Sequence, residues 1–274
     1  MTMVELHRDS LSEFVGLPLA LLEAVRARSI FQVGLGSWDF TEQLIDWCGD
    51  REIRHMAIDP APSRKQLAFF FERSSLIYTG HSLDLLPELP PAEAYVLDGD
   101  HNHYTVFHEL RLIAAKRSRD GSFPLVLIHG VAWPYARRDF YRRPDQLPSR
   151  SRQRYSFHLG ARPGTRLAIN GGVRGDGAYA IALTEGGPGN GVLTAIEDFL
   201  HDFPHLFYAE IPCFHGLGII ADPLQALRLK SILAPYAGNP LLARVEADRL
   251  DLYLQVLRLQ DELAALSMDM QKVL

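Results

Sequence analysis

The sequence predicts an α/β fold built on a mostly parallel β-sheet. Three observations lead to this prediction. Short apolar segments alternate with segments that fit helices, which is the pattern of a parallel sheet covered by helices on both faces. Two further apolar segments near residues 206–221 are spaced as a hairpin. The 274 residues, 47% of them hydrophobic, suffice to bury the core of one large domain.

The elements follow from apolar runs and from the turn residues between them. Strands are expected at 30–33, 55–59, 76–78, 94–97, 125–128, 178–183, 206–211 and 217–221. Helices are expected at 11–28 (interrupted at Gly16-Leu17-Pro18), 42–50, 63–73, 83–86, 106–116, 192–203, 224–233 and 241–274. The region 133–176 lacks apolar periodicity and is rich in Arg, Gly and Pro. Because loops this long are often functional and this one carries Trp133 and several tyrosines, we expect an ordered lid over the active edge.

The chain is organised around a glycine turn after its first strand. The apolar run 30–33 leads into Gly34 and Gly36, and Ser37 follows directly before a segment that can be helical. Glycines let backbone approach a ligand closely, and a helix start offers free N–H groups to it. An ordinary strand-to-helix turn is the alternative, since a lone Gly-x-Gly is weak evidence. Asp39 stands where a dinucleotide fingerprint has its third glycine, which disfavours a pyrophosphate and hence NAD.

Polar side chains follow the other predicted strands. Asp59 ends the second strand, at the place of an acid that binds ribose hydroxyls. Ser82, Asp98 and His129 follow the third, fourth and fifth strands. Ligands bind at the carboxyl ends of such strands. A ribose acid without room for pyrophosphate suits S-adenosylmethionine (SAM). For Ser82, a helix N-cap is an equal alternative to a place near adenine.

Composition excludes several classes of function. A net charge of −5 argues against a nucleic-acid binder, which is normally basic. No apolar run reaches the roughly 18 residues of a membrane span, and residues 1–10 lack the pattern of a signal peptide. Two cysteines, Cys48 and Cys213, give no disulfide framework, so a reducing cytoplasm is expected.

The C-terminal segment 241–274 predicts helix pairing. Apolar residues keep heptad spacing at Val245, Leu252, Val256, Leu259, Leu263, Leu266, Met270 and Val273, and Arg249 interrupts them. A regular seam indicates packing against another helix. The partner helix could belong to the same chain or to a second copy, and we expect a homodimer or a higher homo-oligomer.

Three stretches resemble a known family. They are Val96–Tyr104 (VLDGDHNHY), His129–Asp139 (HGVAWPYARRD) and Glu185–Asp198 (EGGPGNGVLTAIED). They are similar to a bacterial class I SAM-dependent methyltransferase family related to macrocin-type sugar O-methyltransferases and cephalosporin-hydroxylase-like proteins. The resemblance covers roughly residues 30–222. It implies a seven-stranded Rossmann-like sheet with an antiparallel last strand, a methyltransferase domain at 1–222 with its lid insertion, and C-terminal helices at 223–274.

The resemblance also implies roles for individual residues. Gly34, Gly36 and Ser37 would cradle the methionine part of SAM, Asp59 would bind the ribose and Ser82 would lie near adenine. Asp98 would contact the cofactor at the methyl-transfer centre. The acceptor would most often be a hydroxyl group, on a sugar-bearing or other small natural product.

Relatives in this family often hold a divalent cation beside the acceptor. They use the acid after the fourth strand and a His-Asp pair after the fifth, where this chain has His129-Gly130. Asp98 and His129 are the candidate ligands here, helped by Asp100 or His101. Mg²⁺ is the ion the resemblance implies, although hard cations prefer oxygen ligands.

Methyl transfer to oxygen needs alignment and the removal of a proton. Histidine suits the role of base because its ordinary pKa is about 6.5. We therefore predict that His129 is the base, that His101 is second and that Asp98 orients the base or the acceptor. His129 could instead only cap its strand.

Four lid residues are predicted to contact the acceptor, namely Trp133, Tyr135, Arg137 and Arg138. The lid arginines would suit an acidic acceptor, and Arg–Asp pairs in a solvated loop are the alternative. Three functions stay open besides methylation of a small hydroxyl compound. They are methylation of a peptide or protein carboxylate or side chain, an inert partner with this fold, and the disfavoured NAD-dependent enzyme.

Overall fold

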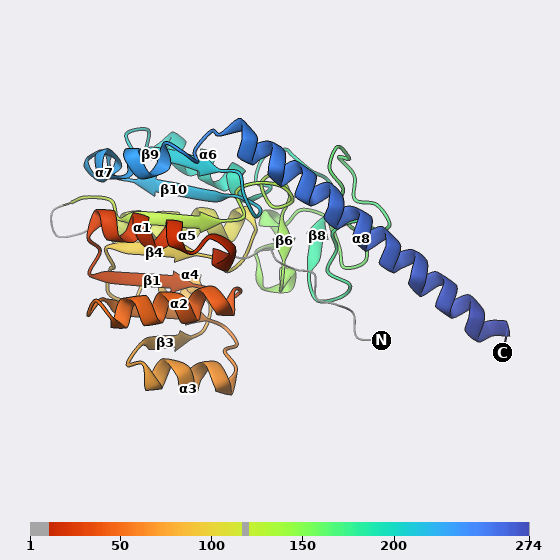
Figure 1. Cartoon of the computed structure of the whole chain (residues 1–274), viewed down its shortest axis with the longest axis horizontal. Coiled ribbons are helices and arrows are strands. Elements are labelled where there is room, and N and C mark those ends of the chain that lie inside the picture. The colour runs from red at the N-terminus through yellow and green to blue at the C-terminus, as the bar shows by residue number, and fades with distance from the viewer. Residues whose placement is uncertain (1–10, 117–120, 274) are drawn as a thin grey trace.

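The computed structural model describes residues 11–116 and 121–273, and it contains a seven-stranded sheet (Figure 1). The strands are β1 (Ser29–Val33), β2 (Arg54–Asp59), β3 (Leu76–Thr79), β4 (Ala94–Leu97), β5 (Leu125–His129), β9 (Phe207–Ile211) and β10 (Leu217–Ala221). Their order across the sheet is β3-β2-β1-β4-β5-β10-β9. The first five run parallel, while β10 is antiparallel to both of its neighbours. The predicted parallel sheet with an antiparallel last strand is confirmed.

The register of the parallel strands lines up the residues that follow them. Val33 of β1 pairs with Ile58 of β2 and with Leu97 of β4. Leu97 in turn pairs with Ile128 of β5. The next residue of each strand therefore reaches the same edge of the sheet. This edge carries the first loop glycine and three of the predicted polar site residues: Gly34, Asp59, Asp98 and His129.

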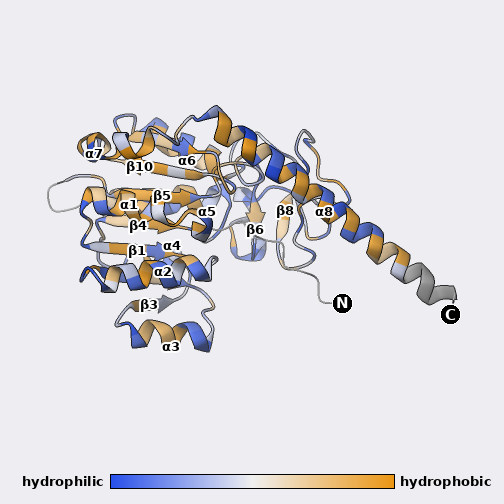
Figure 2. Cartoon of the chain, in the orientation of Figure 1, coloured by the Kyte–Doolittle hydropathy of each residue, from blue (hydrophilic) through white to orange (hydrophobic). Residues whose placement is uncertain are grey.

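Helices cover both faces of the sheet. They are α1 (Gly16–Val25), α2 (Trp38–Gly49), α3 (Arg64–Glu72), α4 (Ser82–Leu85), α5 (His103–Ala115), α6 (Val192–Asp202) and α7 (Pro223–Leu233), preceded by a short 3₁₀ helix, η1 (Leu11–Phe14). α5 and α6 pack on one face, and α1, α2 and α7 pack on the other. Successive residues of a strand face opposite sides, and both sides are covered here, so strands such as β4 and β5 read as apolar runs (Figure 2).

Caps explain why two helices begin earlier than apolar periodicity predicts. Ser37 accepts a hydrogen bond from the Phe40 amide and begins α2 at Trp38. Asn102 accepts one from the Thr105 amide at 2.9 Å and begins α5 at His103. N-cap residues of these types satisfy amides that lack a partner within the helix. Both caps lie in the loops of the site edge, so the loops are anchored to their helices.

The lid region is ordered into a small second sheet. Its strands are β6 (Phe140–Tyr141), β7 (Tyr155–Ser156) and β8 (Ala180–Ala182), with β8 between the other two. Two 3₁₀ turns, η2 (Pro144–Gln146) and η3 (Ser149–Ser151), connect β6 to β7. In Figure 1 this sheet stands beside the large sheet, near the helix α8. The expectation of an ordered lid agrees with this arrangement.

Asp139 fastens the lid to the large sheet. It is fully buried and accepts hydrogen bonds from the amide of His103 at 2.7 Å, the amide of Gly191 at 2.6 Å and the hydroxyl of Tyr141 at 2.7 Å. Buried Asn190 accepts from the amide of Asp139 at 2.8 Å. Residues of all three family-like stretches thus meet here, and their polar groups satisfy one another in the interior.

The long C-terminal helix α8 (Pro240–Val273) packs along the lid and then projects beyond it (Figure 1). Its inner side contributes Tyr253, Leu254 and Leu257 to the lid's apolar cluster. The Arg174 guanidinium of the lid pairs with both carboxylate oxygens of Asp261, at 2.6 and 3.0 Å. The helix therefore supports the lid from outside.

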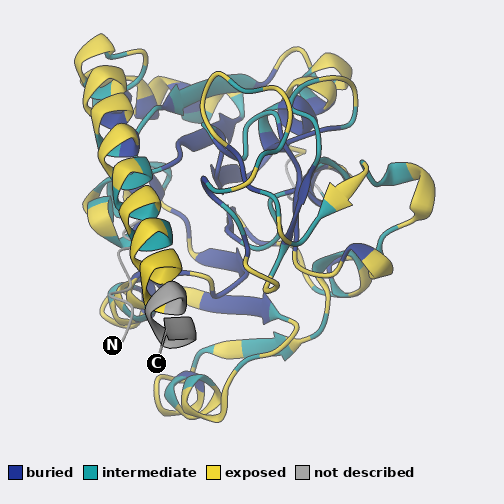
Figure 3. Cartoon of the chain, turned by 90° about the vertical axis from the view of Figure 1, so that its right-hand side faces the viewer, coloured by how far each residue is buried: buried dark blue, intermediate teal, exposed yellow. Residues whose placement is uncertain are grey.

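The heptad seam of α8 lies on its outer side. Its described members Val245, Leu252, Leu259, Leu263 and Leu266 are exposed, whereas Val256 is half-buried (Figure 3). Arg249, which interrupts the seam, pairs with Glu246 at 2.8 Å and lies over the ring of Phe214. The interruption thus marks a contact with the body of the protein.

Some expectations concern residues outside those described. They are the reading of residues 1–10, the end of the last helix at Leu274, and the side chains of Met270 and Val273 in the seam. Within the described part of the chain, no helix combines the length and apolarity needed to cross a bilayer.

Candidate functional site

The site edge lies where the strand order of the sheet changes direction. β1 has β2 on one side and β4 on the other, so the loops after β1 and β4 lead to opposite faces of the sheet. Ligands of open α/β sheets bind in the crevice that this switch opens. A cavity of about 160 Å³ is found here, between the strand ends and the lid. Its lining is Gly36, Ser37, Asp98, Gly99, Asp100, His101, His129, Tyr135, Phe140, Tyr141, Arg142 and Tyr179.

The two glycines after β1, Gly34 and Gly36, have different roles. Gly34 has φ +84°, and a Cβ there would lie 2.3 Å from the Asp98 carbonyl oxygen. Gly34 therefore lets the loops after β1 and β4 touch. Gly36 is exposed and lines the cavity. Only Gly36 of the pair offers its backbone to a ligand, and the Ser37 cap beside it lines the cavity as well.

Asp59 and Ser82 lie at the same edge but do not line this cavity. The Asp59 carboxylate accepts the amide of Leu35 at 3.1 Å and the amide of Ala61 at 2.8 Å. Each of its oxygens keeps lone pairs for a further donor. Ser82 begins α4 and donates to Glu109 at 2.5 Å, while His81 is the N-cap residue. The side chain of Ser82 is therefore tied to a buried carboxyl group.

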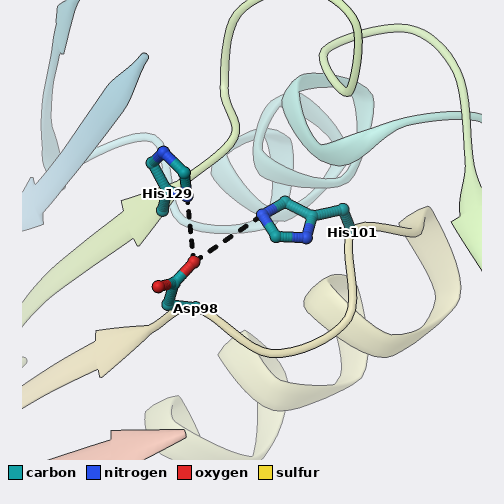
Figure 4. A group of neighbouring side chains, drawn as sticks. All are labelled: Asp98, His101 and His129. Atoms are coloured by element: carbon teal, nitrogen blue, oxygen red, sulfur yellow. Dashed lines mark hydrogen bonds and ion pairs between the residues drawn. The ribbon is translucent and has the colours of Figure 1, made fainter. Parts of the chain in front are cut away.

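Asp98, His101 and His129 converge beneath the lid (Figure 4). Asp98 follows β4, His101 stands in the loop after it, and His129 ends β5. His129 Nδ1 lies 2.9 Å from Asp98 Oδ1, and His129 Nε2 donates to the Phe214 carbonyl oxygen at 2.8 Å. A carbonyl only accepts, so Nε2 carries a proton. The other ring nitrogen, Nδ1, faces the Asp98 carboxylate.

His101 presents its Nε2 atom to the same carboxylate at 3.8 Å. This atom is buried and has no hydrogen-bond partner among the described residues. Burial lowers the pKa of His101 to about 4, assisted by the nearby His129, so the ring is neutral at neutral pH. Burial acts to raise the pKa of Asp98, but the attraction and hydrogen bond of His129 bring it below its ordinary value. Asp98 is therefore ionised.

Two further acids, the buried Glu109 and the half-buried Asp100, belong to the same region. Burial raises the pKa of Glu109 to about 8, and repulsion by Asp100 adds to this. Burial also raises the pKa of Asp100, which lines the cavity, although Arg142 opposes that shift. This edge of the sheet thus carries an ionised acid, Asp98, and two acids whose pKa values are raised.

The four predicted lid residues divide between cavity and scaffold. Tyr135 lines the cavity and its ring packs on His101, with centroids 4.3 Å apart. Trp133 packs against the lid's apolar cluster and its carbonyl accepts from His215. Trp133, Arg137 and Arg138 do not belong to the cavity lining. Arg137 pairs with Glu197 at 2.6 Å on α6.

Arg138 is fully buried inside the lid. Its guanidinium donates to the carbonyls of Ala182 at 2.6 Å and Arg166 at 3.0 Å. A guanidinium committed to main-chain carbonyls in this way stabilises the lid fold. Arg138 thus supports the lid and does not line the cavity.

Sequence reasoning missed four lining residues from the lid and its small sheet, namely Phe140, Tyr141, Arg142 and Tyr179. The stretch Phe140-Tyr141-Arg142 forms β6 and its end. A two-residue strand is too short to leave a periodic signal. Arg142 is the lid arginine that reaches the cavity.

The donor set at the edge does not fit the magnesium that the resemblance implies. Two of the three convergent donors are imidazole nitrogens, whereas Mg²⁺ takes oxygen ligands in near-ideal octahedral geometry. The glycine at 130 also leaves one carboxylate fewer than the family pattern.

Comparison with known proteins gives matches of structure only. No protein-family model matches the chain, and no curated protein matches it. Among solved structures, an SAH-bound methyltransferase from Podospora anserina is 14% identical over 75% of this chain and 77% of its own, with a TM-score of 0.42. A cofactor-bound protein, Rv0187, from MTB is 16% identical over 79% of this chain and 83% of its own, at 0.44.

An O-methyltransferase family protein from Burkholderia thailandensis is 15% identical over 77% of this chain and 56% of its own, with a TM-score of 0.44. At these similarities the matches identify neither a substrate nor a reaction for this chain. The strand order, with the antiparallel β10 between β5 and β9, is by itself the expected class I methyltransferase fold.

Proposed function

We propose that this chain is a SAM-dependent methyltransferase that transfers a methyl group to a hydroxyl of a small molecule, such as a sugar-bearing natural product. One observation carries the proposal. The glycine turn, the ribose acid Asp59, and the Asp98–His101–His129 cluster all meet at the switch point of a sheet with the class I methyltransferase strand order. A nucleoside cofactor and an acceptor need these groups side by side.

The residues present fit SAM. Gly36 is exposed beside the Ser37 cap, so the backbone can approach the methionine part closely. Asp59 retains acceptor capacity for ribose hydroxyls, and Ser82 with Glu109 stands next along the edge as the candidate for adenine. When bound, SAM supplies an electrophilic methyl group. The cavity of about 160 Å³ is smaller than the roughly 300–1,000 Å³ of a whole ligand site, so it suits only the reacting ends of the cofactor and the acceptor.

The chain's own residues position the acceptor and receive its proton. Tyr135 and Phe140 give the cavity apolar walls, and the ionised Asp98 is an acceptor for a hydroxyl. Positioning contributes several kcal/mol to such reactions, and a general base about a hundred- to ten-thousand-fold. That His129 is the base stays a prediction. Both ring nitrogens of His129 are engaged, Nε2 with the Phe214 carbonyl and Nδ1 with Asp98, whereas His101 Nε2 has no hydrogen-bond partner among the described residues.

The test replaces each histidine singly by alanine. Methyl release from labelled SAM is measured with a panel of hydroxyl-bearing acceptors, and SAM binding is measured separately by calorimetry. Loss of turnover with intact SAM binding supports a role in the chemical step. His108→Ala, on α5 outside the cluster, is the matched control. Intact turnover in His129→Ala would remove that residue from the mechanism.

A carboxylate-bearing acceptor, including one on a peptide or protein, is the second candidate. Arg142 lines the cavity and carries a positive charge there. Arginine pairs well with carboxylates. An acceptor panel with matched neutral and acidic members discriminates the two, and no methyl transfer to any member would favour an inert partner with this fold. A homo-oligomer in the cytoplasm remains the expected setting.

A further inference from the structure

We propose that Asp98, His101 and His129 bind a divalent transition-metal ion of the class of Mn²⁺, Fe²⁺, Co²⁺ or Zn²⁺. The three side chains come from the loop after β4 and the end of β5 and point toward one another (Figure 4). One donor atom from each lies within 4.8 Å of the others. Two imidazoles and one carboxylate are a ligand set typical of such ions and not of Mg²⁺.

The outer hydrogen bond of His129 is the one a metal ligand needs. Its Nε2 donates to the Phe214 carbonyl at 2.8 Å, which turns Nδ1 toward Asp98. Histidines that bind metals almost always donate their second N–H to a carbonyl or carboxylate, because this fixes the ring and its tautomer. The carbonyl belongs to a loop in which Phe214 and His215 adopt left-handed φ angles of 49° and 66°. Such costly backbone is held at functional positions.

His101 is the third donor, and its ring is already held in place. Tyr135 packs against it at 4.3 Å between ring centroids. Its Nε2 is buried, lies 3.8 Å from Asp98 Oδ1 and has no hydrogen-bond partner in the described part of the chain. A buried polar atom without a partner is costly and calls for an explanation. Coordination to an ion would satisfy it.

Gly130 shows how the ligand set changed from the family pattern. A Cβ on Gly130 would lie 2.2 Å from His101 Cδ2 and 2.8 Å from His101 Nε2. The His101 ring therefore fills the space of the expected carboxylate. Gly130 thus has two effects. It removes one carboxylate from the magnesium ligand set, and it leaves room for the His101 imidazole.

The distances suit an ion after a small adjustment. Donors about 2.1 Å from one ion lie roughly 3–3.5 Å apart in tetrahedral sites. The His129–Asp98 distance is 2.9 Å and the His101–Asp98 distance is 3.8 Å. The three residues also line the cavity, so an ion that they hold would face it. Metal binding by these three residues does not depend on the proposed function. Only the further role of the ion, lowering the pKa of a bound acceptor hydroxyl, rests on that function.

The experiment titrates the chelator-treated full chain with Co²⁺, Zn²⁺ and Mg²⁺. Binding is followed by calorimetry and, for Co²⁺, by visible absorption, which reports nitrogen coordination. We expect one Co²⁺ per chain, bound at least about 100-fold more tightly than Mg²⁺. Asp98→Asn and His101→Ala should each weaken Co²⁺ binding by at least about 10- to 100-fold, while His108→Ala should not.

A double variant separates the site from mere loss of folding. His101→Ala with Gly130→Asp returns a carboxylate to position 130 and should shift the preference toward Mg²⁺. Melting temperature and SAM binding are measured on every sample. Absence of Co²⁺ binding, equal binding of Mg²⁺, or unchanged Co²⁺ binding in His101→Ala would overturn the site. If SAM binds but no ion does, the metal site fails alone, and if SAM does not bind, the proposed function fails separately.

Discussion

The imidazole of His101 occupies the space that a side chain on residue 130 would need. The Cβ position of Gly130 lies 2.2 Å from His101 Cδ2, and Gly130 has φ +83°. Both features restrict residue 130 to glycine while His101 stays where it is. The two residues are thus one structural unit, although they follow different strands.

We predict that Gly130→Ala lowers the free energy of unfolding by about 1–3 kcal/mol, from left-handed backbone and from the clash with His101. Thermal or denaturant unfolding measures the change. His101→Ala in the same chain should recover the steric part, so a double-mutant cycle should give a favourable coupling energy. Strictly additive effects would mean that the two residues do not compete for space.

Asp59→Asn should weaken SAM binding by about 10- to 100-fold. The substitution keeps the size but removes the charge and one acceptor oxygen, and hydrogen bonds to charged groups contribute about 1.5–3 kcal/mol. Calorimetric titration gives the dissociation constant. Asp50→Asn at the exposed end of α2 is the control and should bind SAM as the original chain does. Unchanged affinity in Asp59→Asn would exclude this acid from ribose binding.

Stability should fall as pH rises between about 4.5 and 8 because of Glu109. Its pKa is raised to about 8 in the folded protein, against an ordinary value of 4.5. In this window the folded chain holds a proton that the unfolded chain has lost. The slope from this group is up to about 1.4 kcal/mol per pH unit. Glu109→Gln should remove that slope and raise stability at pH 8, as measured by urea unfolding across pH. An unaltered dependence of stability on pH in Glu109→Gln would show that Glu109 is not the source of the slope.

The outer seam of α8 should join two copies of the chain. Leu252 and Leu259 are exposed on it, and heptad spacing favours helix pairing. Replacing both by lysine should convert a dimer or larger assembly into a monomer, as seen by light scattering after size-exclusion chromatography. Leu227→Lys, an exposed leucine of α7, should leave the assembly intact. A monomeric parent chain at high concentration would argue against pairing through the seam.

The sequence predicted the large sheet well because its strands are buried on both faces and read as apolar runs. It also predicted that Asp59, Asp98 and His129 share an edge, since parallel strands end together. The helix starts at Trp38 and His103 were missed because a polar cap, and not apolar periodicity, sets them.

The lid was the least predictable part. Its two- and three-residue strands are held by contacts distant in sequence, such as the Asp139 amide to Asn190. Such pairings leave no periodic pattern. For the same reason the basic composition of the lid could not indicate that Arg138 is buried while Arg142 lines the cavity. The steric exchange between Gly130 and His101 also required three-dimensional positions.

Binding of SAM is the central claim, and calorimetric titration of the full chain with SAM and, in parallel, with NAD tests it most directly. The account predicts one SAM per chain with a micromolar or tighter dissociation constant, a binding that weakens in Asp59→Asn, and no binding of NAD at comparable concentrations. Binding of NAD with no binding of SAM would contradict it.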